Sequence, residues 1–194
     1  MPQQKLPIVI LISGSGSNLQ AIIDAANDDL PVELRAVISN RADAYGLERA
    51  RQAGIETIVI DHTRYDGRAA FDAELQRIID RYQPGLVVLA GFMRILTDEF
   101  VNHYAGRMIN IHPSLLPRHK GTNTHARAIE AGDTEAGCSV HLVTAELDSG
   151  PVLLQARVPI LKGDTAESLA ARVLEQEHRI YPEAIRQFAL RHLA

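Results

Sequence analysis

Asn110, His112 and Asp148 have side chains suited to catalysis, because an imidazole and a carboxylate can transfer protons and an amide can donate hydrogen bonds. Asn110 and His112 lie two positions apart at the end of a short apolar run, and Asp148 lies in a loop with glycine and proline on one side. A carboxylate close to His112 would favour the protonated imidazole and make a general acid or base available. The alternatives are a structural histidine and an aspartate that serves only to form a turn.

The segment Gly14-Ser-Gly-Ser-Asn18 is a candidate phosphate-binding turn between a strand-like run and a helical pattern. Backbone N–H groups of such a turn, with the start of the next helix, can bind phosphate without a lysine. Leu19 replaces the third glycine of G-x-G-x-x-G, and no Gly-Lys-Ser/Thr follows, so a dinucleotide or ATP is disfavoured. The segment is therefore either a monophosphate site or a tight turn with a helix cap.

Other candidate residues surround a possible apolar binding wall. Gly91-Phe-Met-Arg-Ile-Leu96 combines apolar side chains with one charge, which suits a flat heteroaromatic ligand. Arg68 and Arg94 are candidate anion binders, although a surface arginine is more often solvated or packed.

His141 lies in an apolar stretch, and we expect it to be a hydrogen-bonded interior residue. The sequence contains no histidine and carboxylate pattern typical of a metal site.

Alternating strand and helix patterns must position these residues. Strands are expected at residues 6–12, 32–38, 55–60, 86–90 and 108–112, with one helix in each of the first three intervals. Ser17 or Asn18 is expected to cap the first of these helices. This order predicts an α/β fold, with a doubly wound, mostly parallel sheet, helices on both faces, and ligands at the carboxyl ends of the strands.

The pattern changes in the last third of the chain. Residues 139–143 and 152–158 are strand-like and are joined by a loop rich in turn-forming residues, so we expect a hairpin-like extension of the sheet. Residues from Ala166 onward are helical, and Pro182 is expected to kink or split that helix.

Composition and charge narrow the class of protein. A chain of 194 residues suits a single domain, and we place no domain boundary. The formal net charge of -4 argues against nucleic acid or an anionic membrane as a partner. The N-terminal segment lacks the long apolar stretch of a signal peptide, and the lone Cys138 cannot form an intrachain disulfide. We therefore expect a soluble, cytoplasmic protein.

The chain resembles the folate-dependent formyltransferases over nearly all of its length. The segments that carry the resemblance are Ile12-Ser-Gly-Ser-Gly-Ser-Asn-Leu-Gln20, Leu89-Ala-Gly-Phe-Met-Arg-Ile-Leu96, Asn110-Ile-His-Pro-Ser-Leu-Leu-Pro117 and Leu147-Asp-Ser-Gly-Pro-Val152. The first is similar to that of members acting on glycinamide ribonucleotide. The resemblance implies one Rossmann-type domain, with a phosphate-binding half at about residues 1–100 and a folate-binding and catalytic half at about 101–194.

The resemblance also implies formyl transfer from 10-formyltetrahydrofolate, as co-substrate, to glycinamide ribonucleotide in purine synthesis, without a metal. The catalytic residues would be Asn110, His112 and Asp148. Ribonucleotide-binding residues would be Gly16, Ser17 and Asn18 and, at the start of the last helix, Leu174, Glu175, Gln176 and Glu177. Folate-binding residues would be Arg68, Met93, Arg94, Ile95, Leu96, Asn110, Thr144, Ala145, Glu146, Leu147 and Asp148. We expect a monomer or homodimer.

Two other readings compete with this one. A methionyl-tRNA formyltransferase or a formyltetrahydrofolate hydrolase would share the three catalytic residues, but each is expected to need a further domain for which this chain has no room. A non-catalytic nucleotide-binding module would explain the glycines equally well. It would not explain why Asn110, His112 and Asp148 all fall at strand ends or in loops.

Overall fold

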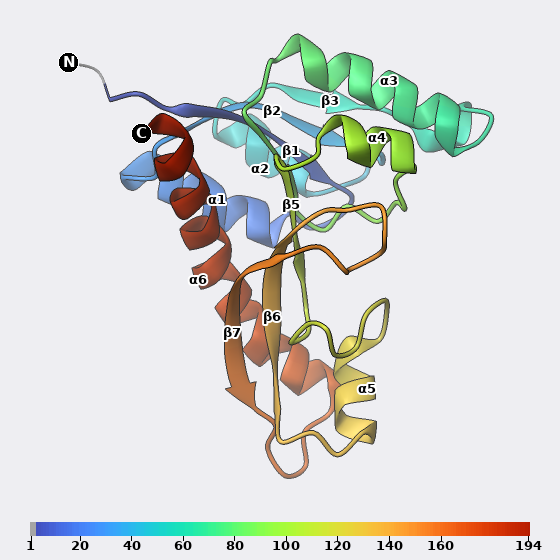
Figure 1. Ribbon diagram of the computed structural model, residues 1–194, viewed down its shortest axis with the longest axis vertical. Helices are drawn as coiled ribbons and strands as arrows, with labels where there is room; N and C mark the ends of the chain where they lie inside the picture. Colours follow the sequence, from blue (N-terminus) through green and yellow to red (C-terminus); the bar gives the residue numbers. More distant parts are fainter. Residues whose placement is uncertain (1–2) are drawn as a thin grey trace.

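A seven-stranded sheet crosses the molecule in the computed structural model, which describes residues 3–194 (Figure 1). The first two residues belong to the segment in which no signal peptide is expected, and they lie outside the described residues. The strand order is β3-β2-β1-β4-β5-β6-β7. The strands are β1 Leu6–Ile12, β2 Val32–Ser39, β3 Thr57–Val59, β4 Leu86–Leu89, β5 Met108–His112, β6 Glu135–Leu142 and β7 Val152–Pro159.

The sheet is parallel from β3 to β5 and antiparallel from β5 to β7. All seven residues of β1 except Pro7 are buried, as a central strand covered on both faces requires. The mostly parallel sheet and its hairpin-like extension are therefore confirmed.

Helices cover both faces of the sheet, as predicted (Figure 1). One face packs against α1 Ser17–Asp28, α2 Gly46–Gln52 and α6 Ala166–Leu193, and the other against α3 Arg68–Arg81 and α4 Asp98–His103. The alternating side chains of β1 divide between these layers, with Ile8 and Ile10 on the α1 side and Val9 and Leu11 on the α3 side. A short helix, α5 Thr124–Glu130, packs against α6, and a 3-10 turn spans His62–Arg64.

The cap of α1 differs from the prediction. The N-cap is Gly16, which has φ 74° and makes no side-chain hydrogen bond, so the expectation of Ser17 or Asn18 is wrong. Glycine enters this left-handed region at little steric cost, and it therefore turns the chain one residue earlier than a polar cap would.

Helix α6 continues through Pro182 from Ala166 to Leu193, so the expected split does not occur. An interior proline removes one backbone hydrogen bond and costs about 3 kcal/mol. Burial of Ile180, Tyr181 and Ile185 around it stabilises the continuous helix. As a consequence, Glu177 lies in the middle of the last helix, and its expected position at the start is wrong.

The sequence patterns missed α4 and α5. These helices contain six and seven residues, too few to establish a helical period. A local signal was present for α4, because Thr97 caps it by accepting a hydrogen bond from the Phe100 N–H.

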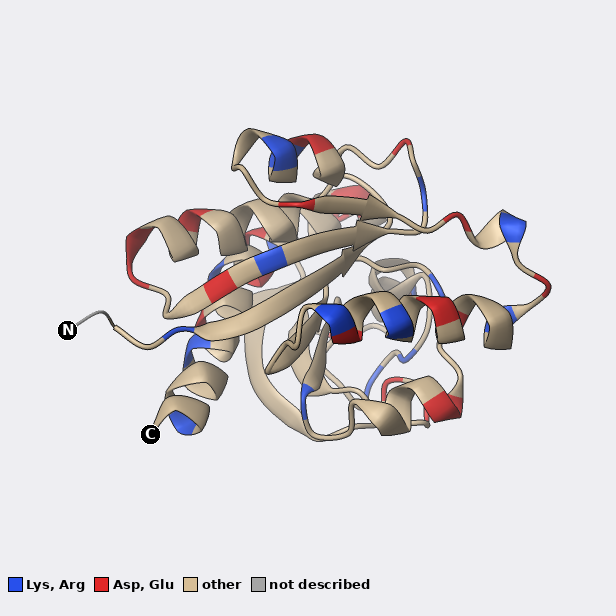
Figure 2. Ribbon diagram, turned by 90° about the horizontal axis from the view of Figure 1, so that it is seen from above, with Lys and Arg blue, Asp and Glu red and all other residues tan. Residues whose placement is uncertain are grey.

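Charges of both signs alternate along α3 in Figure 2, whereas α1 and α4 carry acidic residues and no Lys or Arg. No helix among residues 3–194 is long and apolar enough to cross a membrane.

Candidate active site

The loops after β1 and β4 line a cavity of about 420 Å³. Its walls are residues 13–18, Arg41, Ala90, Gly91 and Met93. The Ser13 hydroxyl joins the two loops, because it accepts a hydrogen bond from the Met93 N–H at 2.8 Å and donates to Asn40. The strand order reverses between β1 and β4, and ligands of doubly wound sheets bind at this switch point.

The turn after β1 has the backbone geometry of an anion site. Among residues 3–194, no acceptor is found for the backbone N–H groups of residues 14–19. These groups surround the N-terminus of α1, where the partial positive charge of the helix also favours an anion. The geometry therefore supports a phosphate site over a turn that is merely structural.

Glu177 approaches this turn from α6. Its carboxylate accepts a hydrogen bond of 3.1 Å from the Asn18 amide, and burial raises its pKa while that bond lowers it. The other three predicted α6 residues differ in placement: Glu175 is exposed, Leu174 is half-buried, and Gln176 accepts a hydrogen bond from Arg179. Among residues 3–194, no hydrogen bond is found between these three residues and the turn.

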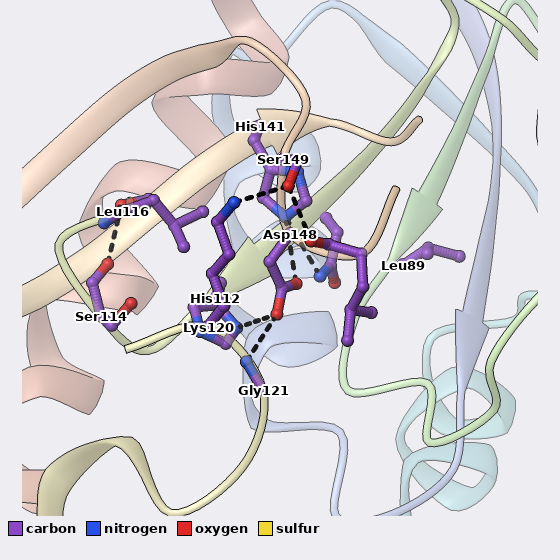
Figure 3. A network of polar contacts seen from close by, with 12 residues as sticks. Leu89, His112, Ser114, Leu116, Lys120, Gly121, His141, Asp148 and Ser149 are labelled. Atoms are coloured by element: carbon purple, nitrogen blue, oxygen red, sulfur yellow. Dashed lines mark hydrogen bonds and ion pairs between the residues drawn. The ribbon is translucent and has the colours of Figure 1, made fainter. Parts of the chain in front are cut away.

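Asp148 lies beside His112 and His141 in the loop before β7 (Figure 3). Asn110 and His112 are two positions apart on β5 and so share one face of the strand, and the Asn110 amide reaches this group through His141. The Nδ1 atom of His112 lies 3.6 Å from Asp148 Oδ2, and both side chains are nearly buried. The Gly121 N–H donates to the same Asp148 oxygen at 2.9 Å.

The second ring nitrogen of His112 is fixed by a main-chain group. Nε2 lies 2.9 Å from the carbonyl oxygen of His119, which can only accept, so Nε2 carries a hydrogen. The His119 ring is itself 2.7 Å from the Asp133 carboxylate. An oxygen atom therefore lies near each ring nitrogen of His112, the His119 carbonyl at Nε2 and the Asp148 carboxylate at Nδ1. Sequence patterns gave no indication of the His119–Asp133 pair.

His141 is buried and hydrogen-bonded, as expected, but it also contacts the catalytic candidates. It pairs with Asn110 across β5 and β6, and its Nε2 lies 3.4 Å from the Asn110 amide and 4.0 Å from Asp148. Burial lowers the pKa of His141, which favours the neutral ring. Its Nδ1 lies 3.0 Å from the Leu142 carbonyl, so Nδ1 carries the hydrogen and Nε2 can accept from Asn110.

The predicted folate-binding residues form exposed apolar surface on two loops. Met93, Ile95 and Leu147 are exposed by 77%, 56% and 57%. The Arg94 guanidinium lies 5.0 Å from the centre of the Phe71 ring on α3. Arg68 is exposed at the start of that helix, one turn before Phe71.

The rest of this predicted set lies beside those residues. Leu96 is half-buried against the core beneath α3, and in the second loop the Thr144 hydroxyl donates to the Glu146 carbonyl at 3.3 Å. Ala145 lies between them in the chain.

No group of three or more metal-ligating His, Cys, Asp or Glu side chains is found in residues 3–194.

A model of the formyl transferase family matches residues 6–185. The chain belongs to the formyl transferase family. It is 60% identical to the phosphoribosylglycinamide formyltransferase of Escherichia coli. The match covers 94% of this chain and 86% of that protein. It is 45% identical to the human trifunctional purine biosynthetic protein adenosine-3. That match covers 96% of this chain and 19% of the human protein.

Solved structures agree with this assignment. The formyl transferase superposes on the phosphoribosylglycinamide formyltransferase of Coxiella burnetii with a TM-score of 0.93 and 59% identity. That match covers 96% of this chain and 88% of the other. A glycinamide ribonucleotide transformylase from Symbiobacterium toebii gives a TM-score of 0.92 at 51% identity, over 95% and 87% of the two chains.

Proposed function

We propose that the chain transfers the formyl group of 10-formyltetrahydrofolate to the amine of N1-(5-phospho-D-ribosyl)glycinamide. The products are N2-formyl-N1-(5-phospho-D-ribosyl)glycinamide and tetrahydrofolate, in de novo purine synthesis. The names of relatives at 60% and 48% identity support this reaction. The observation that carries it is a phosphate-type turn and a polar trio at the carboxyl ends of strands near the switch point of one sheet.

In this proposal the two substrates meet between the loops. The turn at Gly16, Ser17 and Asn18 binds the phosphate, and Glu177 binds the ribonucleotide beyond it. The folate ring lies against the exposed apolar side chains of the loops at 93–96 and 144–148. Both halves of the chain then contribute to both substrates, because the folate loop at 93–96 belongs to the first half and Glu177 to the second.

The chemistry begins with attack of the glycyl amine on the formyl carbon, which places negative charge on the formyl oxygen. Asn110 donates a hydrogen bond to that oxygen through its amide. His112 donates through Nδ1, because Nε2 is occupied by the His119 carbonyl and the 3.6 Å approach of Asp148 is too long for a hydrogen bond. Such donors stabilise the tetrahedral intermediate more than the substrate.

Proton transfer completes the reaction. The new C–N bond forms as the amine loses a proton, and the bond from the formyl carbon to the folate nitrogen breaks as that nitrogen gains one. Asp148 lies beside His112 and assists this movement, directly or through water. Binding both substrates in one site supplies further acceleration.

We place this reaction in the cytoplasm. The proposal is supported by the buried free thiol of Cys138, which is compatible with a reducing compartment.

The deciding experiment follows the absorbance of 10-formyltetrahydrofolate with and without the ribonucleotide. We expect loss of the formyl compound that depends on the ribonucleotide and produces the formylated amide. Loss without the ribonucleotide would indicate a hydrolase. Absence of any turnover, with the ribonucleotide still bound in calorimetry, would indicate a non-catalytic binding module.

A further inference from the structure

Helix α2 packs behind the turn that is proposed to bind phosphate. At its first residue the Gly46 N–H donates to the Gly14 carbonyl at 3.0 Å. One turn later the Arg49 Nε donates to the Ser15 carbonyl at 2.8 Å. Neither Gly46 nor Arg49 lines the cavity. Two successive carbonyl oxygens of the turn are therefore held by groups outside the cavity, where they do not repel an anion.

The contact between α2 and the turn is close enough to exclude side chains. A Cβ atom on Gly16 would lie 2.6 Å from the Gly46 Cα. A Cβ atom on Gly46 would lie 2.5 Å from the Ile12 side chain and 3.2 Å from the Gly16 Cα. Because real Cβ atoms do not approach backbone atoms this closely, the two glycines allow Arg49 to reach Ser15.

Arg49 also contributes charge at this place. It has no ion-pair partner among residues 3–194, where its contacts are the Ser15 carbonyl, the Gln20 amide at 3.5 Å and the Tyr45 ring at 4.9 Å. Burial of His178 on α6 lowers the pKa of that histidine, and the positive charge of Arg49 lowers it further. A cation beside the turn, with no carboxylate to neutralise it, favours a bound anion.

We propose that Arg49 is a positioning residue for the substrate's phosphate. It holds the Ser15 carbonyl so that the neighbouring N–H groups remain available, and its charge attracts the phosphate from behind the turn. The inference rests on the proposed function, and it assigns to Arg49 a role specific to the phosphate rather than to the amine or the formyl group.

The test compares the ribonucleotide with its dephosphorylated ribonucleoside in the full-length protein. For Arg49→Met we expect the KM of the ribonucleotide to rise about tenfold, as for loss of a charge-assisted contact, with kcat little changed. The kcat/KM of the ribonucleoside should stay within about twofold. Arg49→Lys retains the charge but not the planar guanidinium, and should fall between the wild-type protein and Arg49→Met.

Arg51→Met is the matched control, because Arg51 lies on the same helix, is exposed, and pairs only with Glu48 at 3.7 Å. This variant should behave as wild type with both substrates. Equal losses for the ribonucleotide and the ribonucleoside in Arg49→Met would overturn the proposal in favour of a purely structural role. So would an unchanged ribonucleotide KM.

Calorimetric binding of the ribonucleotide to wild-type and Arg49→Met protein separates this inference from the proposed function. If the wild-type protein binds the ribonucleotide without turning it over, the proposed reaction fails while the weaker binding of Arg49→Met still supports the role of Arg49. If both proteins bind the ribonucleotide equally, the role of Arg49 is refuted whatever the turnover.

Discussion

At the scale of single residues, the candidate site depends on how Asp148 is held. Its backbone has φ 52°, and its carboxylate faces the Gly121 N–H, His112 and His141. An aspartate tolerates this left-handed conformation better than most residues do. The constraint fixes the carboxylate beside the His112 Nδ1 before any substrate binds, which is the preorganisation that acid–base catalysis requires.

Asp148→Asn should therefore reduce kcat by about 10²- to 10⁴-fold while leaving the KM of the ribonucleotide within about threefold. The amide has nearly the shape of the carboxylate, but it lacks the charge that favours protonated His112. Steady-state kinetics of the variant measure both constants. Asp66→Asn, at an exposed position, is the control and should retain full activity. A kcat for Asp148→Asn within threefold of wild type would contradict the proposed role.

The residues of the site differ in how far the sequence could predict them. Asn110, His112 and Asp148 were predicted because strand-end position and family resemblance indicated the same residues, and the structure brings them together. The His119–Asp133 pair was not predicted, since a contact between residues 14 positions apart depends on the path of an irregular loop. The Asn18–Glu177 bond spans 159 positions, so local patterns carry no information on it, and only the family resemblance placed the two residues in one site.

At the scale of elements, long and strongly patterned segments were predicted and short ones were not. The apolar residues of β1 and β4 form nearly continuous runs, and the buried apolar residues of α3 recur at the spacing of a helix. In α6 a local rule failed at Pro182, because tertiary packing of a long helix outweighed the loss of one hydrogen bond.

One buried hydroxyl shows how α6 is joined to the strands that end at the site. The hydroxyl of Tyr181, which is fully buried, donates to the Leu89 carbonyl at 2.6 Å and lies 3.3 Å from that of Ile109. Tyr181→Phe should lower the free energy of unfolding by about 1–2 kcal/mol, because a buried carbonyl loses its donor. Urea unfolding measures this change, and kcat should remain near the wild-type value. An unchanged urea midpoint would show that the bond contributes nothing.

At the scale of the whole molecule, the alternation of strands and helices predicted the layers and the edge at which ligands bind. It did not predict the strand order β3-β2-β1-β4-β5, because strand and helix patterns do not record which strands become neighbours. The reversal between β1 and β4 is nevertheless what brings the turn at residues 14–18 beside Met93. The site is therefore a product of topology as much as of its own residues.

Buried histidines give the whole molecule a predictable response to acid. Burial lowers the pKa of His125, His141 and His178 below the ordinary histidine value. Below about pH 6.5 the unfolded chain therefore binds more protons than the folded chain, and the free energy of unfolding falls as the pH falls. Glu177 acts in the opposite direction, because its raised pKa makes the folded protein take up a proton before the unfolded chain does.

The double variant His125→Gln/His178→Gln tests this effect while His141 remains in place beside Asn110. Glutamine does not titrate, so on going from pH 7.5 to pH 5.5 the variant should lose less stability than the wild-type protein, in which the pKa values of both histidines are lowered. Urea unfolding at a series of pH values measures both slopes. Within the described part of the chain, residues 3–194, the buried ring atoms His125 Nδ1 and His178 Nε2 have no hydrogen-bond partner, so neither substitution breaks a bond at those atoms. Parallel curves for the two proteins would mean that His125 and His178 titrate alike in the folded and unfolded chains, and acid sensitivity would then have to arise from His141 or the carboxylates.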